Sequence, residues 1–435
     1  MNIIGISAFY HDSAAALVSD GEIISAYQEE RFTRKKHDSD FPINSINQIL
    51  NDNNLLLSDI DFICFYEKPI LKFDRLIESY ISIAPSGFKS FRSAMPIWLK
   101  EKIFLKKSIL KSLQKIDQNF EESKIKFSEH HLSHASSAFY PSPFEEAIIL
   151  TVDGVGEWCT SSIAIGKKNL IEIKKEIHFP HSLGLLYSAF TFYTGFKVNS
   201  GEYKLMGLAP YGEPKYEEVI LNNLIDVKDD GSFHLNQKYF GYLRDLKMIN
   251  KKFEALFQQK ARKVDEELTQ FHMDIASSIQ SVLEKIILKI GLYCKEKYKI
   301  ENICLAGGVA LNCVANGKLL NSEIFEKIWI QPASGDAGGS LGAALALWYQ
   351  ELKKTRYPKS SDSMKGSYLG KKFSDGEIKN YLESCGAIFK EYSENSLLEE
   401  TASLLNKNKA IGWFQGRMEF GPRALGSRSI ISSPI

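Results

Sequence analysis

Two stretches of the chain share one local pattern, and this repetition limits the possible folds more than any other feature. Residues 3–25 read as strand, turn, strand, turn, strand, and residues 147–173 repeat that order. A long helical stretch follows each copy. Two such units predict a duplicated α/β domain with a cleft between its halves. Chance is the alternative explanation, because β-hairpins recur in α/β proteins.

The remaining segments suggest where this domain ends. We assign residues 1–357 to the first domain, with a helical insertion at about 66–125. The lysine-rich run 97–115 in that insertion is interpreted as a surface helix, although a membrane or an anionic partner is the alternative contact. Residues 358–367 are polar and predict a linker. Residues 368–435 then make a piece of only ~70 residues, which is small for an independent domain.

Composition restricts the partners and the compartment. With 54 Lys and Arg against 53 Asp and Glu, the net charge is +1, which argues against a dedicated nucleic-acid binder. The six cysteines form no CxxC pair and fit a reducing compartment. The N-terminus has no signal-peptide pattern, and no apolar run reaches the ~18 residues of a membrane span. We therefore expect a soluble cytoplasmic protein without a membrane partner.

Histidines and aspartates form a candidate metal site. His130 and His134 are four residues apart, so on a helix they share one face and can bind one metal, whereas His131 is turned away by about 100°. Asp153 and Asp336 each follow a strand, where side chains line the cleft of open α/β folds. If the four converge, they favour a borderline cation such as iron or manganese. Otherwise the histidines are ordinary surface or core residues, and the aspartates cap turns or helices.

Glycine-rich loops and the first polar loop point to a nucleotide cleft. The loops 306–312 and 334–342 each join a strand to a helix, and 201–212 is similarly glycine-containing. Backbone in such loops can approach a phosphate or ribose, although none matches a standard phosphate-loop motif. His11 and Asp12 follow the first strand, where a neutral histidine could accept a proton from a hydroxyl. The alternative is that Asp12 caps a turn and His11 is incidental.

Three arginines near the end of the sequence suggest an anion site. Arg417, Arg423 and Arg428 lie among glycines in the run GRMEFGPRALGSRS. Arginine binds phosphate or carboxylate with two parallel hydrogen bonds. The alternative is a basic surface loop.

Taken together, these motifs resemble those of the O-carbamoyltransferases of the nodulation-factor and antibiotic-tailoring type. The matching stretches are FYHDSAAALVSDG, EERFTRKKHD, HHLSHASSAFY, LTVDGVGE, SGEYKLMGLAPYG, LAGGVALNCVANGK, QPASGDAGGSLGAA and GRMEFGPRALGSRSI. The resemblance implies a first domain with the duplicated actin-like ATPase and sugar-kinase (ribonuclease H-like) fold, similar to tRNA threonylcarbamoyl-transferring enzymes. It also implies the start of an α+β, YrdC-like domain that forms an acyl-adenylate.

The resemblance further implies a two-step biosynthetic reaction. Carbamoyl phosphate and ATP, with Mg²⁺, would give carbamoyl-adenylate and pyrophosphate in the second domain. The first domain would pass the carbamoyl group to a hydroxyl of a sugar-like or secondary-metabolite acceptor and release AMP. Dimers are common in the family, so a homodimer is among the expected states.

The family's functional residues map onto positions of this sequence. The metal ligands correspond to His130, His134, Asp153 and Asp336, with iron(II) as the implied metal. His11 corresponds to the histidine at the carbamoyl group, a candidate base next to Asp12. The nucleotide loop corresponds to Gly307, Gly308 and Asn312, with Glu202 and Lys204 as further candidates. The carbamoyl phosphate and ATP site of the second domain corresponds to Arg417, Arg423 and Arg428.

One departure from the family bears on activity. Family members continue for well over a hundred residues past the last matching stretch, so we expect most of the adenylate-forming domain to lie outside this chain. The activation step is then not expected from the chain alone. Two other functions are weighed against carbamoyl transfer. A tRNA threonylcarbamoyl transferase is disfavoured by the net charge of +1 and by the segment GRMEFGPRALG, and the other alternative is a non-catalytic nucleotide-binding remnant.

Overall fold

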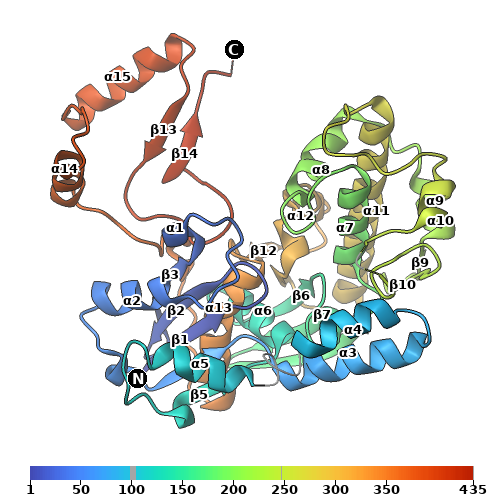
Figure 1. Cartoon of the computed structure of the whole chain (residues 1–435), viewed down its shortest axis with the longest axis horizontal. Coiled ribbons are helices and arrows are strands. Elements are labelled where there is room, and N and C mark those ends of the chain that lie inside the picture. Colours follow the sequence, from blue (N-terminus) through green and yellow to red (C-terminus); the bar gives the residue numbers. More distant parts are fainter. Residues whose placement is uncertain (98–103, 246, 435) are drawn as a thin grey trace.

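The computed structural model describes residues 1–97, 104–245 and 247–434, which form two α/β halves and a smaller C-terminal lobe (Figure 1). Part of the lysine-rich run, including Lys100 and Lys102, lies outside the described residues. No helix among the described residues combines the length and the apolar character needed to cross a membrane.

Each half is built on a five-stranded sheet, and the two sheets have the same topology. The first has the order β3–β2–β1–β4–β5, in which β1 pairs antiparallel with β2 and parallel with β4. The second has the order β8–β7–β6–β11–β12, in which β6 pairs antiparallel with β7 and parallel with β11. The strands of the first sheet are β1 (Asn2–Ser7), β2 (Ala14–Ser19), β3 (Glu22–Gln28), β4 (Phe62–Phe65) and β5 (Ile125–Phe127). Those of the second are β6 (Glu146–Val152), β7 (Cys159–Lys167), β8 (Leu170–His178), β11 (Asn302–Ala306) and β12 (Lys327–Ile330).

This shared topology confirms the α/β class and the predicted duplication. The two repeated runs of the sequence are the three antiparallel strands that begin each sheet. The central strands of the two sheets are β1 (NIIGIS) and β6 (EAIILTV). Both are almost wholly buried, because helices cover both faces of a sheet of this kind.

Helices complete both halves. The first half contains α1 (Glu30–Thr33), α2 (Ile43–Asp52), α3 (Pro69–Ile83), α4 (Phe88–Ile97), α5 (Leu105–Leu113) and α6 (His130–Phe139). The second contains α7 (Leu183–Tyr193), α8 (Glu202–Leu208), α9 (Glu217–Asn223), α10 (Lys251–Leu256), α11 (Gln270–Tyr298), α12 (Cys313–Asn321) and the short strands β9 (Ile225–Val227) and β10 (Phe233–Leu235). The helix α13 (Asp336–Ala346) packs against both β1 and α6, so residues far apart in sequence share one core.

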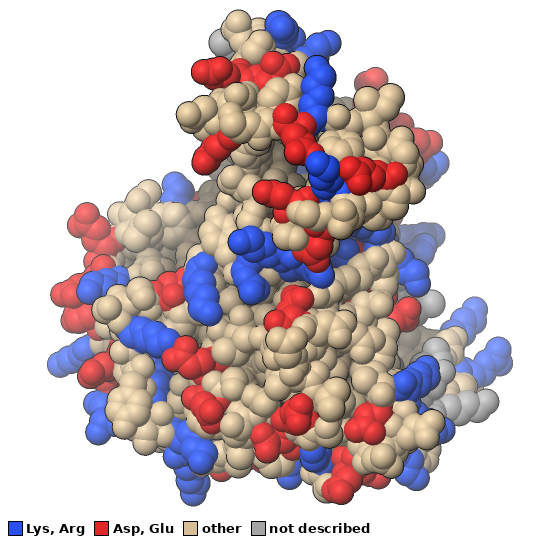
Figure 2. Space-filling model, turned by 90° about the vertical axis from the view of Figure 1, so that its left-hand side faces the viewer, with Lys and Arg blue, Asp and Glu red and all other residues tan. Residues whose placement is uncertain are grey.

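The C-terminal lobe stands apart from the two halves in Figure 1. It comprises α14 (Asp375–Ser384), α15 (Glu394–Asn406) and the hairpin of β13 (Ile411–Phe414) with β14 (Arg428–Ile431). Neither α14 nor α15 buries a side chain. Lys and Arg side chains gather along the junction below this lobe, as Figure 2 shows. The YrdC-like character of the lobe stays a prediction.

The segment expected as a linker is packed against the first half. Met364 is buried in the core of that half, and the backbone N–H of Ala26 on β3 donates to the carbonyl of Leu369 at 3.1 Å. Phe420 is also buried there, with its N–H bonded to the carbonyl of Ser367 at 2.7 Å. These contacts hold the stretch around residue 420 next to the cleft.

Candidate metal centre and cleft

Four side chains from three elements converge at the base of the cleft. His130 and His134 lie on one face of α6, Asp153 directly follows β6, and Asp336 begins α13. The Nε2 atom of His130 is 3.1 Å from both Asp153 Oδ2 and His134 Nε2, and 3.7 Å from Asp336 Oδ1. One ligand atom from each of the four residues lies within 4.8 Å of the others. By contrast, His131 turns its Nδ1 toward Ser162 at 3.0 Å, as its position on the helix predicted.

This arrangement fits a bound cation. Ligands at roughly 2.1 Å from one ion stand about 3.0–3.5 Å apart, close to the separations of the four side chains. Burial raises the pKa of the Asp153 carboxyl, but interactions with His130 and His134 outweigh it and hold that pKa well below its usual range. The carboxylate is therefore anionic and suited to a metal. Burial lowers the pKa of the His130 and His134 imidazoles, but the neighbouring carboxylates outweigh it and raise the pKa of both. Metal binding therefore competes with protons at these nitrogens.

Three further side chains lie against two of these residues, His130 and Asp336. Tyr66 donates its hydroxyl to Asp336 Oδ2 at 3.1 Å. The buried carboxylate of Glu67 lies 3.8 Å from His130 Nδ1, on the ring edge opposite the cluster. Glu157 accepts the backbone N–H of His130 at 3.0 Å and fixes the start of α6. Sequence reasoning missed all three, because no spacing rule connects them to the histidines.

His11 faces the same cluster from the first half. Its Nδ1 is 2.9 Å from Asp12 Oδ2, and its Nε2 is 3.8 Å from Asp336 Oδ2. Burial lowers the pKa of the His11 imidazole, but Asp336 and Asp12 outweigh it and raise the pKa to about 9. The other oxygen of Asp12 contacts His37 Nδ1 at 2.7 Å. His37 was not singled out from the sequence.

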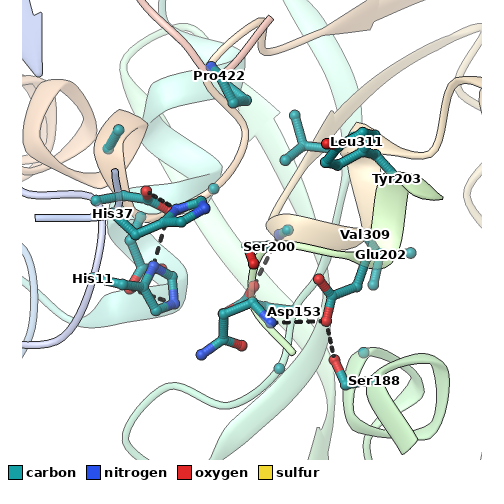
Figure 3. Close-up of a pocket in the computed structure, with 18 of the residues that line it drawn as sticks. His11, His37, Asp153, Ser188, Ser200, Glu202, Tyr203, Val309, Leu311 and Pro422 are labelled. Carbon is teal, nitrogen blue, oxygen red and sulfur yellow. Dashed lines mark hydrogen bonds and ion pairs between the residues drawn. The ribbon is translucent and has the colours of Figure 1, made fainter. Parts of the chain in front are cut away.

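A cavity of about 490 Å³ opens above the cluster, between the two halves. Figure 3 shows His11 and His37 on one side, and Ser188, Glu202, Tyr203 and Val309 on the other. Its lining also includes Pro422, Arg423 and Ala424, which come from the stretch next to the C-terminal lobe. The cleft is therefore built from three parts of the chain.

Only some of the predicted nucleotide-binding residues line the cavity. Gly308, Asn312 and Glu202 line the cavity. The N–H of Gly308 donates to Asp153 Oδ1 at 2.8 Å, which ties the glycine loop to the metal cluster. Gly307 is not a lining residue, and its φ of +86° places it against the backbone of Val152.

Two of the predicted nucleotide-binding residues, Asn312 and Glu202, also make hydrogen bonds within the protein, and a third, Lys204, lies outside the cavity. The side-chain oxygen Oδ1 of Asn312 accepts from the N–H of Ala315 and so caps α12. Glu202 accepts hydrogen bonds from Ser188 and from the backbone of Asn199. Lys204 is exposed and does not line the cavity.

The three arginines do not meet at one point. Arg423 lies at the cleft, where it donates to the carbonyl of Leu311 at 3.2 Å and covers the ring of Tyr203. Arg428 forms an ion pair with Glu419 at 3.1 Å. Arg417 is exposed and donates to the carbonyl of Gly370. The three side chains thus make separate contacts, and their role in a carbamoyl phosphate and ATP site stays a prediction.

Known proteins match this chain over its whole length. The family described as "Carbamoyltransferase N-terminus" matches residues 2–345, and "Carbamoyltransferase C-terminus" matches 402–435. The uncharacterized protein sll1178 of Synechocystis sp. is 56% identical, over 100% of this chain and 71% of its own length. Nodulation protein NolNO of Sinorhizobium fredii is 35% identical, over 98% of this chain and 59% of its own. The crystal structure of component A of (R)-2-hydroxyglutaryl-CoA dehydratase from Acidaminococcus fermentans is 14% identical, covering 81% of this chain and 100% of that one, with a TM-score of 0.42.

Proposed function

The chain belongs to the carbamoyltransferase family of enzymes, and from this premise we propose that its cleft transfers a carbamoyl group from carbamoyl-adenylate to the hydroxyl of a small acceptor. The acceptor oxygen attacks the carbamoyl carbon, and the bond from that carbon to the phosphate oxygen breaks. AMP leaves with the electron pair, and the hydroxyl proton passes to a base in the cleft. The products are an O-carbamoyl ester and AMP. Carbamoyl phosphate and ATP are the proposed sources of the donor.

The cluster at the base of the cleft would hold a divalent metal, for which we propose iron(II). His130, His134, Asp153 and Asp336 supply two nitrogens and two anionic oxygens, a donor set suited to a borderline cation. When bound, such a cation supplies Lewis-acid polarisation of an oxygen on the donor. The hydrogen bond from Tyr66 orients Asp336, and the carboxylate of Glu67 lies 3.8 Å from His130 Nδ1.

His11 is the proposed base. It lines the cavity beside Asp336, within reach of a ligand placed above the cluster. Its pKa of about 9 reflects the negative charge of Asp336 and Asp12. Occupation of the cluster by a cation would neutralise Asp336 and lower that pKa toward neutrality, where a base works best.

The upper part of the cavity suits the adenylate. An apolar wall for the adenine ring is formed there by Leu185, Leu283 and Val309. Of the cavity-lining residues in the described part of the chain, only Lys36 and Arg423 are lysine or arginine. Both positive groups lie over the ring of Tyr203. They therefore offer positive charge to a phosphate at the entrance of the cavity.

One observation carries the proposal: the four candidate ligands and His11 meet at the base of a single cavity large enough for a nucleotide. The test supplies the iron(II)-loaded protein with carbamoyl-adenylate and hydroxyl acceptors of three classes: free sugars, aminoglycosides and lipid-linked sugars. We expect AMP release that depends on the acceptor, at a rate of order 1 s⁻¹ with the best class. A mass increase of one carbamoyl group on the acceptor should accompany it.

The matched control is His134→Ala, which removes one candidate ligand. It should reduce acceptor-dependent AMP release to the background of donor hydrolysis. If no acceptor class accelerates AMP release by wild-type protein above that background, the proposal is wrong.

A further inference from the structure

His37 is joined to His11 through a single carboxylate. Asp12 Oδ1 contacts His37 Nδ1 at 2.7 Å, and Asp12 Oδ2 contacts His11 Nδ1 at 2.9 Å. Figure 3 shows the two imidazoles on the same side of the cavity. Both oxygens of Asp12 are therefore engaged, one by each histidine. Burial raises the pKa of Asp12, but its hydrogen bonds to the two histidines outweigh it and lower the pKa, so the carboxylate is anionic.

The backbone holds this arrangement in place. The N–H of Phe9 donates to the carbonyl of Ser39 at 2.7 Å, and the N–H of Ser13 donates to the carbonyl of Asp38 at 2.8 Å. These two bonds flank the contact between Asp12 and His37. The segment that carries His37 is therefore bound directly to the loop that carries His11.

Two residues of this contact have unfavourable backbone conformations. Asp12 has a φ of +54° and His37 a φ of +57°, a left-handed region that residues other than glycine adopt uncommonly. The N–H of His37 donates to Glu30 Oε2 at 2.8 Å, which helps to hold the strained residue. Such strain persists where the surrounding structure requires the side chain at that point.

We propose that His37 is a positioning residue, which through Asp12 holds the His11 imidazole with Nδ1 bound and Nε2 directed toward Asp336 and the cavity. The inference rests on the proposed function, because it assigns His11 a part in transfer. His37 itself lines the cavity but contacts His11 only through Asp12. Its effect is on the orientation of the imidazole rather than on the affinity for the donor.

Two variants of residue 37 separate positioning from general stability. His37→Ala removes the contact with Asp12. In His37→Asn the side-chain amide nitrogen occupies nearly the place of Nδ1, and asparagine tolerates a positive φ. We expect His37→Ala to lower kcat for transfer by ~10–100-fold, as loss of an orienting partner does, with KM for carbamoyl-adenylate changed by less than ~3-fold. His37→Asn should restore kcat to within ~5-fold of wild type.

Thr33→Val is the matched control for loosening the same segment. The Thr33 hydroxyl donates to Asp38 Oδ2 at 2.6 Å, next to His37 but outside its contact with Asp12. This variant should lower the melting temperature while leaving kcat close to wild type. If Thr33→Val and His37→Ala reduce kcat alike, His37 is a structural residue only. The same conclusion follows if kcat of His37→Asn is no higher than kcat of His37→Ala. If His37→Ala does not fold, His37→Gln replaces it, because the glutamine amide lies one carbon beyond the position of Nδ1.

Crystal structures of the same variants give a readout independent of activity. In His37→Ala the contact between His11 Nδ1 and Asp12 Oδ2 should be lost, and in His37→Asn it should remain. Retention of that contact in His37→Ala overturns the positioning role. Wild-type protein without transfer activity would overturn the proposed function instead, and the structural comparison would still decide the role of His37.

Discussion

Gly342 of α13 lies directly against the carbonyl oxygen of Ser133 in α6, so that a Cβ at residue 342 would overlap that oxygen. This contact sets the distance between two helices that carry three of the four candidate metal ligands. His130 and His134 are on α6, and Asp336 is the first residue of α13. Gly342 therefore allows α13 to approach α6 directly beside His134.

We predict that Gly342→Ala forces α6 and α13 apart. Insertion of a methyl group into so tight a contact should cost about 1–3 kcal/mol of unfolding free energy and weaken metal binding. The control is Gly317→Ala on α12, where an added Cβ meets no atom within 4 Å. That variant should be neutral or stabilising by up to ~1 kcal/mol. Urea unfolding and metal titration check both, and equal metal affinity in the two variants would contradict the prediction.

Removal of one candidate ligand should weaken metal binding. We expect His130→Ala to bind iron(II) at least ~10-fold more weakly than wild type, since even indirect changes around a metal ligand have that effect. His178→Ala, which removes an exposed histidine, is the control and should bind one ion as wild type does. Elemental analysis after anaerobic loading and gel filtration gives the stoichiometry. Full occupancy of His130→Ala would exclude His130 as a ligand.

Substitution of His11 tests its proposed role as base. His11→Asn keeps an amide near the place of Nδ1, which contacts Asp12, but removes the Nε2 that faces the cavity. The rate of transfer should fall by ~10²–10⁴-fold, the range for loss of a general base. The affinity for AMP, measured by calorimetry, should stay within ~3-fold, because the change removes no charge from the entrance of the cleft. An unchanged transfer rate would make His11 a bystander.

Arg356 stabilises the helix that carries the candidate ligands. Its buried guanidinium donates to the carbonyls of Phe139, Tyr140, Ser142 and Phe144, at and just beyond the end of α6. Arg356→Met should leave the carbonyls of Tyr140, Ser142 and Phe144 without this donor, and should lower the unfolding free energy by at least about 3 kcal/mol. Urea denaturation followed by circular dichroism measures this loss.

A nearby lysine provides the control for that variant. Lys359 forms an exposed ion pair with Glu22, so Lys359→Ala should change stability by less than about 1 kcal/mol. Similar losses in the two variants would show that the hydrogen bonds of Arg356 contribute no more than a surface charge does.

Local patterns in the sequence were sufficient for the repeated unit and for part of the site. The runs at 3–25 and 147–173 predicted the three antiparallel strands of each sheet, because alternation of strands and turns depends on neighbouring residues. The four-residue spacing of His130 and His134 placed them on one helical face for the same reason. Asp153 and Asp336 were recognised by their positions after strands.

Only the tertiary structure decided which distant residues meet. It places His37 on Asp12, Glu67 beside His130 and Arg423 in the cleft, and it holds Arg417 and Arg428 in other contacts. No periodicity links these positions, since each contact depends on how two separately formed elements pack. The sequence by itself thus determined the elements and the residues that could do chemistry. Packing of α6 against α13, and of one half against the other, determined their geometry, because the distance between elements depends on side-chain volume and close contact rather than on spacing along the chain.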